Sequence, residues 1–253
     1  MTAPSTDFFH DAYNRDDIAY GLDPSGAITE YLRQVGLSGG HALDLGAGAG
    51  RDSLALARAG YQVKSVDMSP RGIERIIERA SEIGVDDRIT PVVADVREID
   101  FPVDTYDAII ATTVLDHIPA DDAETVWRQM AASLTHRGVL YVQVHTTEDP
   151  GSGQLPGSEI DAPISETADA VINYFQPNQL VSWACHPEAD LRVLRYEERR
   201  EWDETHGDPH QHGKAILLAV RSGHFPDWYG QPPAFPKSNS NEIELSSKGT
   251  ETS

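Results

Sequence analysis

The sequence contains little cysteine and no long apolar run. Cys185 is the one cysteine among 253 residues, which excludes an internal disulfide framework and a zinc site built from several thiolates. No stretch approaches the roughly 18 to 20 apolar residues that span a bilayer. The N-terminal residues lack the basic start and apolar run of a secretory signal. We therefore expect a cytoplasmic protein with no membrane partner.

Basic residues are also scarce. The 20 lysines and arginines stand against 41 aspartates and glutamates, giving a formal net charge of −21 at pH 7. A field of that sign repels phosphate backbones, so we expect no nucleic-acid partner. The acids are spread along the chain, and only four of the basic residues are lysines. This composition resembles that of proteins from high-salt cytoplasms, and we interpret the acidic, halophile-like surface as a solubility feature.

From residue 41 onward, short apolar runs alternate with segments of helical periodicity. Five strands are predicted by the runs HALDL, YQVKSVD, ITPVVAD, YDAIIATTVL and VLYVQVH. Ser69 and Pro70, a cap residue followed by proline, mark the start of the helix after the second run. Such an alternation predicts a parallel sheet with helices on both faces.

Two later runs, LRVLRYEERREW and KAILLAV, flank a turn and predict an antiparallel pair. The expected fold class is therefore α/β. We expect a doubly wound, mostly parallel, seven-stranded Rossmann-like sheet with an antiparallel C-terminal hairpin.

A glycine turn leaves the first predicted strand, in the segment DLGAGAGR that begins at Asp44. Glycines let a ligand approach the backbone closely because no Cβ intervenes. The Gly-x-Gly-x-x-Gly pattern of a dinucleotide site would require glycine where Arg51 stands. A carboxylate at position 44 suits the ammonium group of S-adenosylmethionine better than it suits a pyrophosphate. The turn favours S-adenosylmethionine and leaves an NAD(P)-binding oxidoreductase as the alternative.

Two further acids follow the second and third predicted strands. Asp67 lies 17 residues beyond Gly50, where the ribose of the cofactor is expected, and Asp95 is expected near the adenine amino group. NAD enzymes use an acid placed like Asp67, and ordinary turn chemistry also explains single acids at strand ends. Three acids at three successive strand ends, beside one glycine turn, indicate a single ligand cleft at the carboxyl edge of the sheet.

The segments DLGAGAGRDSLALA, SVDMSP, VVADV and YDAIIATTVLDHIP resemble, in order and spacing, the motifs of class I S-adenosylmethionine-dependent methyltransferases. This resemblance covers about residues 40–146. The segment RDSL after the glycine turn, together with YFQPNQL, LRVLRYEE and PHQHGKAILLAVR, is similar to the tellurite-resistance (TehB-type) branch and extends the resemblance to about residue 221. The resemblance implies an enzyme that transfers a methyl group to a small-molecule acceptor by in-line displacement.

Transferred residue by residue, the resemblance implies a set of cofactor contacts: Asp44, Gly46, Ala47, Gly48, Asp67, Met68, Asp95, Val96 and Thr112. Tyr13 and Tyr20 are expected to cover the cofactor. Family members commonly have cysteine where this chain has Ala47, a position that contributes its backbone. The family also places arginine near the acceptor, and none lies between His206 and Lys214, which argues against an oxyanion acceptor. The acceptor atom is left open among oxygen, nitrogen, sulfur and a chalcogen oxyanion.

Histidines are the candidate catalytic residues, with three in one turn (His206, His210 and His212) and His117 after the fourth predicted strand. A neutral imidazole is a suitable general base near working pH. The cluster has two other interpretations: a metal site completed by Asp203 or Asp208, or imidazoles that only cap backbone groups. We assign no metal from the sequence. A non-catalytic cofactor- or metal-binding module is the third functional hypothesis.

The resemblance and the composition together divide the chain into three parts. Residues 1–36 are expected to form a helical lead-in over the cofactor site. Residues 37–222 are expected to form the methyltransferase domain, with a lid loop at 147–165 that is rich in Gly, Pro, Ser and acids. Residues 223–253 are polar and rich in Pro and Ser, and we expect a disordered tail.

Overall fold

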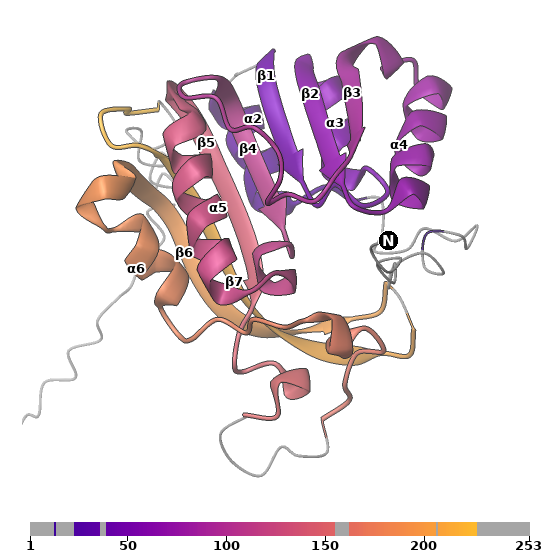
Figure 1. Ribbon diagram of the computed structural model, residues 1–253, viewed down its shortest axis with the longest axis vertical. Helices are drawn as coiled ribbons and strands as arrows, with labels where there is room; N and C mark the ends of the chain where they lie inside the picture. Colours follow the sequence, from indigo (N-terminus) through magenta and orange to yellow (C-terminus); the bar gives the residue numbers. More distant parts are fainter. Residues whose placement is uncertain (1–12, 14–22, 36–38, 155–161, 206, 227–253) are drawn as a thin grey trace, which may run out of the picture.

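The computed structural model describes residues 13, 23–35, 39–154, 162–205 and 207–226 (Figure 1). Seven strands form one sheet in the order β3-β2-β1-β4-β5-β7-β6. The strands are β1 (Gly40–Leu45), β2 (Tyr61–Asp67), β3 (Ile89–Val93), β4 (Tyr106–Thr112), β5 (Leu134–His145), β6 (Leu191–Asp203) and β7 (His210–Arg221). Strands β1 to β5 are parallel, and β7 runs antiparallel to both β5 and β6. The predicted fold class is confirmed.

Helices cover both faces of the sheet (Figure 1). They are α2 (Gly26–Val35), α3 (Arg51–Arg58), α4 (Pro70–Glu82), α5 (Ala120–Ser133) and α6 (Gln179–Ala184). Successive residues of a strand point to opposite faces. Accordingly, Leu43 and Leu45 of β1 pack in the core that contains α5 and α6, whereas Ala42 packs with α2 and α3. None of the helices in the described residues is long and apolar enough to cross a membrane.

The start of α4 follows the sequence signal. Ser69 is the N-cap, its hydroxyl accepts a hydrogen bond from the Gly72 amide at 3.3 Å, and Pro70 occupies the first turn. A Cβ on Gly72 would lie 2.7 Å from the carbonyl oxygen of Gly48. Helix α4 therefore packs directly on the backbone of the glycine turn, which fixes the shape of that turn.

We expect Gly72→Ala to lower the free energy of unfolding by about 1 to 3 kcal/mol, the usual cost of adding a methyl group to a packed site. The clash is with backbone, so no side-chain rotation relieves it. Gly26→Ala is the matched control, because a Cβ there meets nothing within 4 Å. Urea unfolding of both variants measures the effect. A free energy of unfolding equal to that of the wild type would show that α4 does not pack tightly on the backbone of the glycine turn.

Most of the predicted lead-in, residues 155–161 of the predicted lid loop and residues 227–253 of the predicted tail lie outside the described residues. The three-part division of the chain therefore stays a prediction.

Candidate active site

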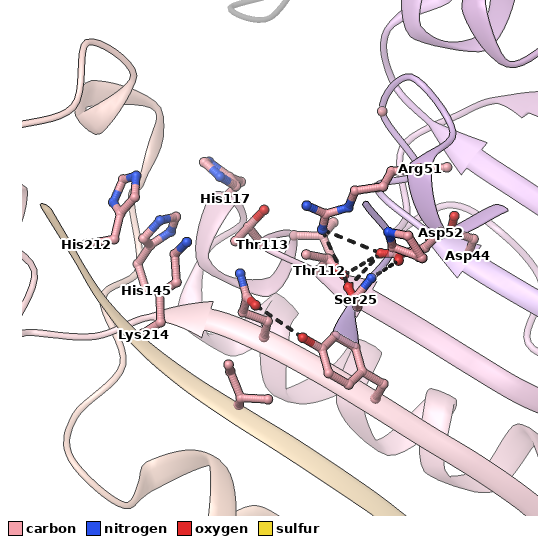
Figure 2. A pocket seen from close by; sticks show the side chains of 18 of the residues that line it. Ser25, Asp44, Arg51, Asp52, Thr112, Thr113, His117, His145, His212 and Lys214 are labelled. Atoms are coloured by element: carbon pink, nitrogen blue, oxygen red, sulfur yellow. Dashed lines mark hydrogen bonds and ion pairs between the residues drawn. The ribbon is translucent and has the colours of Figure 1, made fainter. Parts of the chain in front are cut away.

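One large cavity opens at the carboxyl edge of the parallel strands and reaches the β6–β7 hairpin (Figure 2). Its volume is about 820 Å³. All nine predicted cofactor contacts line it: Asp44, Gly46, Ala47, Gly48, Asp67, Met68, Asp95, Val96 and Thr112. They come together because parallel strands all end at the same edge, so loops from separate strands share one crevice.

Asp67, the last residue of β2, stabilises the glycine turn by accepting hydrogen bonds from backbone amides. One carboxylate oxygen accepts the Gly48 amide at 2.8 Å, and the other accepts the Ser69 amide at 2.8 Å. Gly46 and Gly48 have φ angles of +64° and +52°, a left-handed conformation that favours glycine. A carboxylate offers about four acceptor positions, so these two hydrogen bonds do not exhaust it.

Asp44 is buried beside a second carboxyl group, Asp52. The Ser53 hydroxyl donates to Asp44 at 2.6 Å. Burial, and then repulsion from Asp52, raise the pKa of Asp44 to about 8. Asp52 accepts the Ser25 amide at 2.6 Å, the Ser25 hydroxyl at 2.8 Å and the Thr112 hydroxyl at 3.1 Å. A cation bound beside these two buried carboxyl groups would stabilise their ionised forms.

Arg51 is the basic residue beside this pair. Its guanidinium lies 3.6 Å from Asp52 and lines the cavity (Figure 2). A ligand that carries both an ammonium and a carboxylate would therefore meet charges of opposite sign at this end of the cavity.

Asp95 lines the cavity but is bound by a neighbour. The Arg97 guanidinium contacts both of its carboxylate oxygens, and the Arg97 amide donates to it at 2.9 Å. These contacts lower the pKa of Asp95, the hydrogen bonds from the Arg97 side chain having the largest effect. Met68, which is 50% exposed, also lines the cavity and adds an apolar surface to its wall.

The predicted histidines are placed differently from one another. His117 and His212 line the cavity, and the Nδ1 of His117 lies 2.7 Å from the carbonyl oxygen of Ala170. His210 is buried and is not among the residues that line the cavity, and its Nε2 lies 3.0 Å from the Nε2 of His212. His206 lies outside the described residues.

The two predicted covering tyrosines are also placed differently. Tyr13 lines the cavity, and its hydroxyl would lie 2.8 Å from a Cβ on Gly48, so the ring packs over the glycine turn. Tyr20 lies outside the described residues.

His145, the last residue of β5, lines the cavity and was not predicted from the sequence. Its Nδ1 lies 2.5 Å from a carboxylate oxygen of the fully buried Asp116, which also accepts the His145 amide at 2.8 Å. Burial opposes ionisation of Asp116, but His117 and His145 hold its pKa below the usual value. Its position in the sequence could have indicated this, because His145 stands at the carboxyl end of a parallel strand, as Asp67 does.

Asp149 was not predicted either, and it approaches the histidine pair from the β5–β6 connection. Its carboxylate lies 2.9 Å from Nδ1 of His212. Figure 2 shows the acidic cluster around Asp44 on one side of the cavity, with His117, His145, His212 and Lys214 on the other. The end around Asp44 can therefore hold a cation, and the histidine end can hold a molecule that gives up or shares a proton.

A family model described as a methyltransferase domain matches residues 42–138. The ubiquinone biosynthesis O-methyltransferase of Xylella fastidiosa (strain 9a5c) is 30% identical over 172 residues, covering 65% of this chain and 68% of that protein. The chain spans a smaller share of three other curated methyltransferases that it matches, 50%, 65% and 38% of their lengths.

Two solved structures share the fold. TehB from Haemophilus influenzae has a TM-score of 0.60 at 22% identity, covering 85% of this chain and 66% of TehB. Magnesium protoporphyrin IX methyltransferase (ChlM) from Synechocystis PCC 6803, with S-adenosylmethionine bound, has a TM-score of 0.55 at 19% identity, covering 78% and 77%. At these identities the likeness concerns the fold.

Proposed function

The chain belongs to the class I S-adenosylmethionine-dependent methyltransferases, and from this premise we propose that it methylates a small molecule held between the glycine turn and the β6–β7 hairpin. The observation that carries the proposal is the shared cavity. Three strand-end acids and the glycine turn line one end of it, and polar side chains line the other. Its volume of about 820 Å³ falls within the roughly 300 to 1,000 Å³ of small-molecule sites.

The residues at the glycine-turn end fit the methyl donor. We propose that Asp67 accepts the ribose hydroxyls, Asp44 binds the ammonium, Arg51 binds the carboxylate and Met68 packs on the adenine. The buried Asp44–Asp52 pair is otherwise a costly feature, because burial and the neighbouring carboxyl group both oppose ionisation of Asp44. Since Asp95 is held by Arg97, we expect it to contribute less than Asp67.

When bound, the donor supplies a sulfonium methyl group, and the new bond to the acceptor forms as the bond to sulfur breaks with its electron pair staying on sulfur. The chain's main task is to hold the acceptor in line at near-attack distance. We propose His145 as the base for an acceptor that starts protonated. Asp116 holds the Nδ1 proton of His145, which leaves Nε2 to take the proton. The predicted roles of His117 and His212 at this end stay proposals.

Binding assays test the proposal. We expect S-adenosylmethionine to bind at least 100-fold more tightly than NAD in calorimetry, because Arg51 stands where a dinucleotide site needs glycine. Stronger binding of NAD would overturn the assignment. A screen of oxygen, nitrogen and sulfur acceptors with a labelled methyl donor would then identify the substrate class. The cytoplasmic location and the halophile-like role of the acidic surface stay predictions from composition.

A further inference from the structure

Three potential metal ligands share one face of the β6–β7 hairpin. His210 and His212 are two residues apart on β7, so their side chains point to the same face. Asp203 of β6 pairs directly with His210 in the antiparallel register, and directly opposed residues also share a face. One ligand atom from each of the three lies within 4.8 Å of the other two. Two imidazoles and a carboxylate are a common ligand set for divalent transition metals.

The hydrogen bonds of the two rings fix where their protons lie. The Nδ1 of His210 is 2.7 Å from the carbonyl oxygen of Asp208, which can only accept, so that nitrogen carries hydrogen. The Nδ1 of His212 is 2.9 Å from a carboxylate oxygen of Asp149. That same oxygen accepts the Gly213 amide at 3.1 Å. Each neutral ring then has its lone pair on Nε2.

These two Nε2 atoms face each other at 3.0 Å. Two lone pairs at that distance repel unless a proton or a metal ion lies between them. With metal–nitrogen bonds of about 2.0 to 2.1 Å, nitrogens 3.0 Å apart subtend about 94° at the metal, an angle that suits five-coordinate zinc as well as six-coordinate ions. We propose that Asp203, His210 and His212 bind a divalent transition-metal ion in the wall of the cavity.

The surroundings of the rings support a metal site. Histidines that bind metals usually donate their other N–H to a carboxylate or a carbonyl, and Asp149 and Asp208 supply these acceptors. A Cβ on Gly213 would lie 2.4 Å from the backbone nitrogen of Asp149, so glycine permits the loop to bring Asp149 to His212.

The alternative groupings of ligands on this wall fit a metal less well. In the two groups that contain His145, the carboxylates of Asp116 and Asp149 already hold Nδ1 of His145 and of His212, and each also accepts a backbone amide. One cation also lies near the proposed site: the Lys214 ammonium is 3.6 Å from Asp203 and 2.9 Å from Glu201. We therefore expect the bound ion to displace Lys214 from Asp203 while the contact with Glu201 remains.

Zn²⁺ titration of the chelator-treated full chain tests the site. We expect one Zn²⁺ per chain, with His210→Gln and His212→Gln each weakening binding at least 100-fold. Asp149→Asn should weaken it by about 10- to 100-fold, as losses of such supporting partners do. His186→Gln is the matched control, because His186 is exposed and belongs to none of the ligand groups found among the described residues.

The melting temperature and the circular dichroism spectrum of each variant, compared with those of the wild type, show that the variants are folded, and S-adenosylmethionine affinity is measured separately on the wild type. The absence of stoichiometric Zn²⁺ binding in the wild type would overturn the proposal, since a shared proton would then join the rings. Equal Zn²⁺ binding by wild type and both histidine variants would overturn it as well. Neither result bears on the proposed methyl donor site, because its binding is read separately.

Discussion

Asp67→Ala is expected to abolish detectable S-adenosylmethionine binding. The carboxylate supports the glycine turn through the Gly48 and Ser69 amides, and it is also the proposed acceptor for the ribose hydroxyls. Removing it leaves two backbone N–H groups without this acceptor and the cofactor without its ribose contact. The unpaired amides lower the stability of the free and bound protein alike, whereas two ribose hydroxyls buried without an acceptor cost about 1 to 3 kcal/mol each in the complex alone, so we expect affinity to fall by roughly 100-fold. Calorimetry with the purified variant measures the loss.

Asp95→Ala is the matched control for this experiment. Asp95 also follows a parallel strand and lines the cavity, but Arg97 binds its carboxylate. We expect a loss of no more than about tenfold. Near-normal affinity of the Asp67 variant would remove the main support for the proposed orientation of the donor, and a larger loss at Asp95 would reverse the assigned roles.

Asp44→Asn is expected to weaken S-adenosylmethionine binding while stabilising the protein without ligand. The donor ammonium would lose its buried carboxylate partner, and breaking such a pair costs roughly 2 to 5 kcal/mol, or about 30-fold or more in affinity. In the free protein, burial and Asp52 raise the pKa of Asp44 to about 8. The folded state therefore holds this proton more tightly than the unfolded state does, and the contribution to stability is lost as pH rises from about 4 to 8.

The same titration gives a pH signature. Wild-type affinity should rise by about tenfold or more from pH 6 and peak near pH 8, because Asp44 must lose a proton while the donor ammonium, with a pKa of roughly 7.7 to 8.0, must keep one. Asp44→Asn should lack the rise. Its melting temperature should exceed that of the wild type increasingly from pH 5 to pH 8, as measured by thermal unfolding. Equal pH profiles for the two proteins would contradict the ammonium role of Asp44.

The sequence located the cofactor side of the cavity because that side is built from local signals. Asp44 and Asp67 end apolar runs, and the glycine turn follows the first run directly. The carboxyl ends of parallel strands lie at the same edge of a sheet. Residues far apart in the sequence can therefore be assigned to one site from the sequence alone. The Ser69–Pro70 signal placed the start of α4 in the same local way.

The histidine side could not be predicted in this way. Asp116 and His145 are 29 residues apart, and Asp149 and His212 are 63 apart. No periodicity relates such positions, so His212 was predicted without its partner Asp149, and His145 and Asp116 were not predicted at all. The candidate His210 was found by proximity to His212 in sequence, but the ring lies outside the cavity lining.

The sequence by itself determined the alternation of strands and helices, the seven-stranded sheet and the carboxylates at the ends of the strands, because hydrophobic periodicity and turn chemistry are properties of neighbouring residues. Only the tertiary structure decided which acid holds which imidazole. Those pairs depend on how closely separate segments approach, as where the loop of Asp149 rests against the bare backbone of Gly213. Such a close approach is set by packing. Packing therefore determines which acid faces each imidazole, and so which ring nitrogen carries the proton.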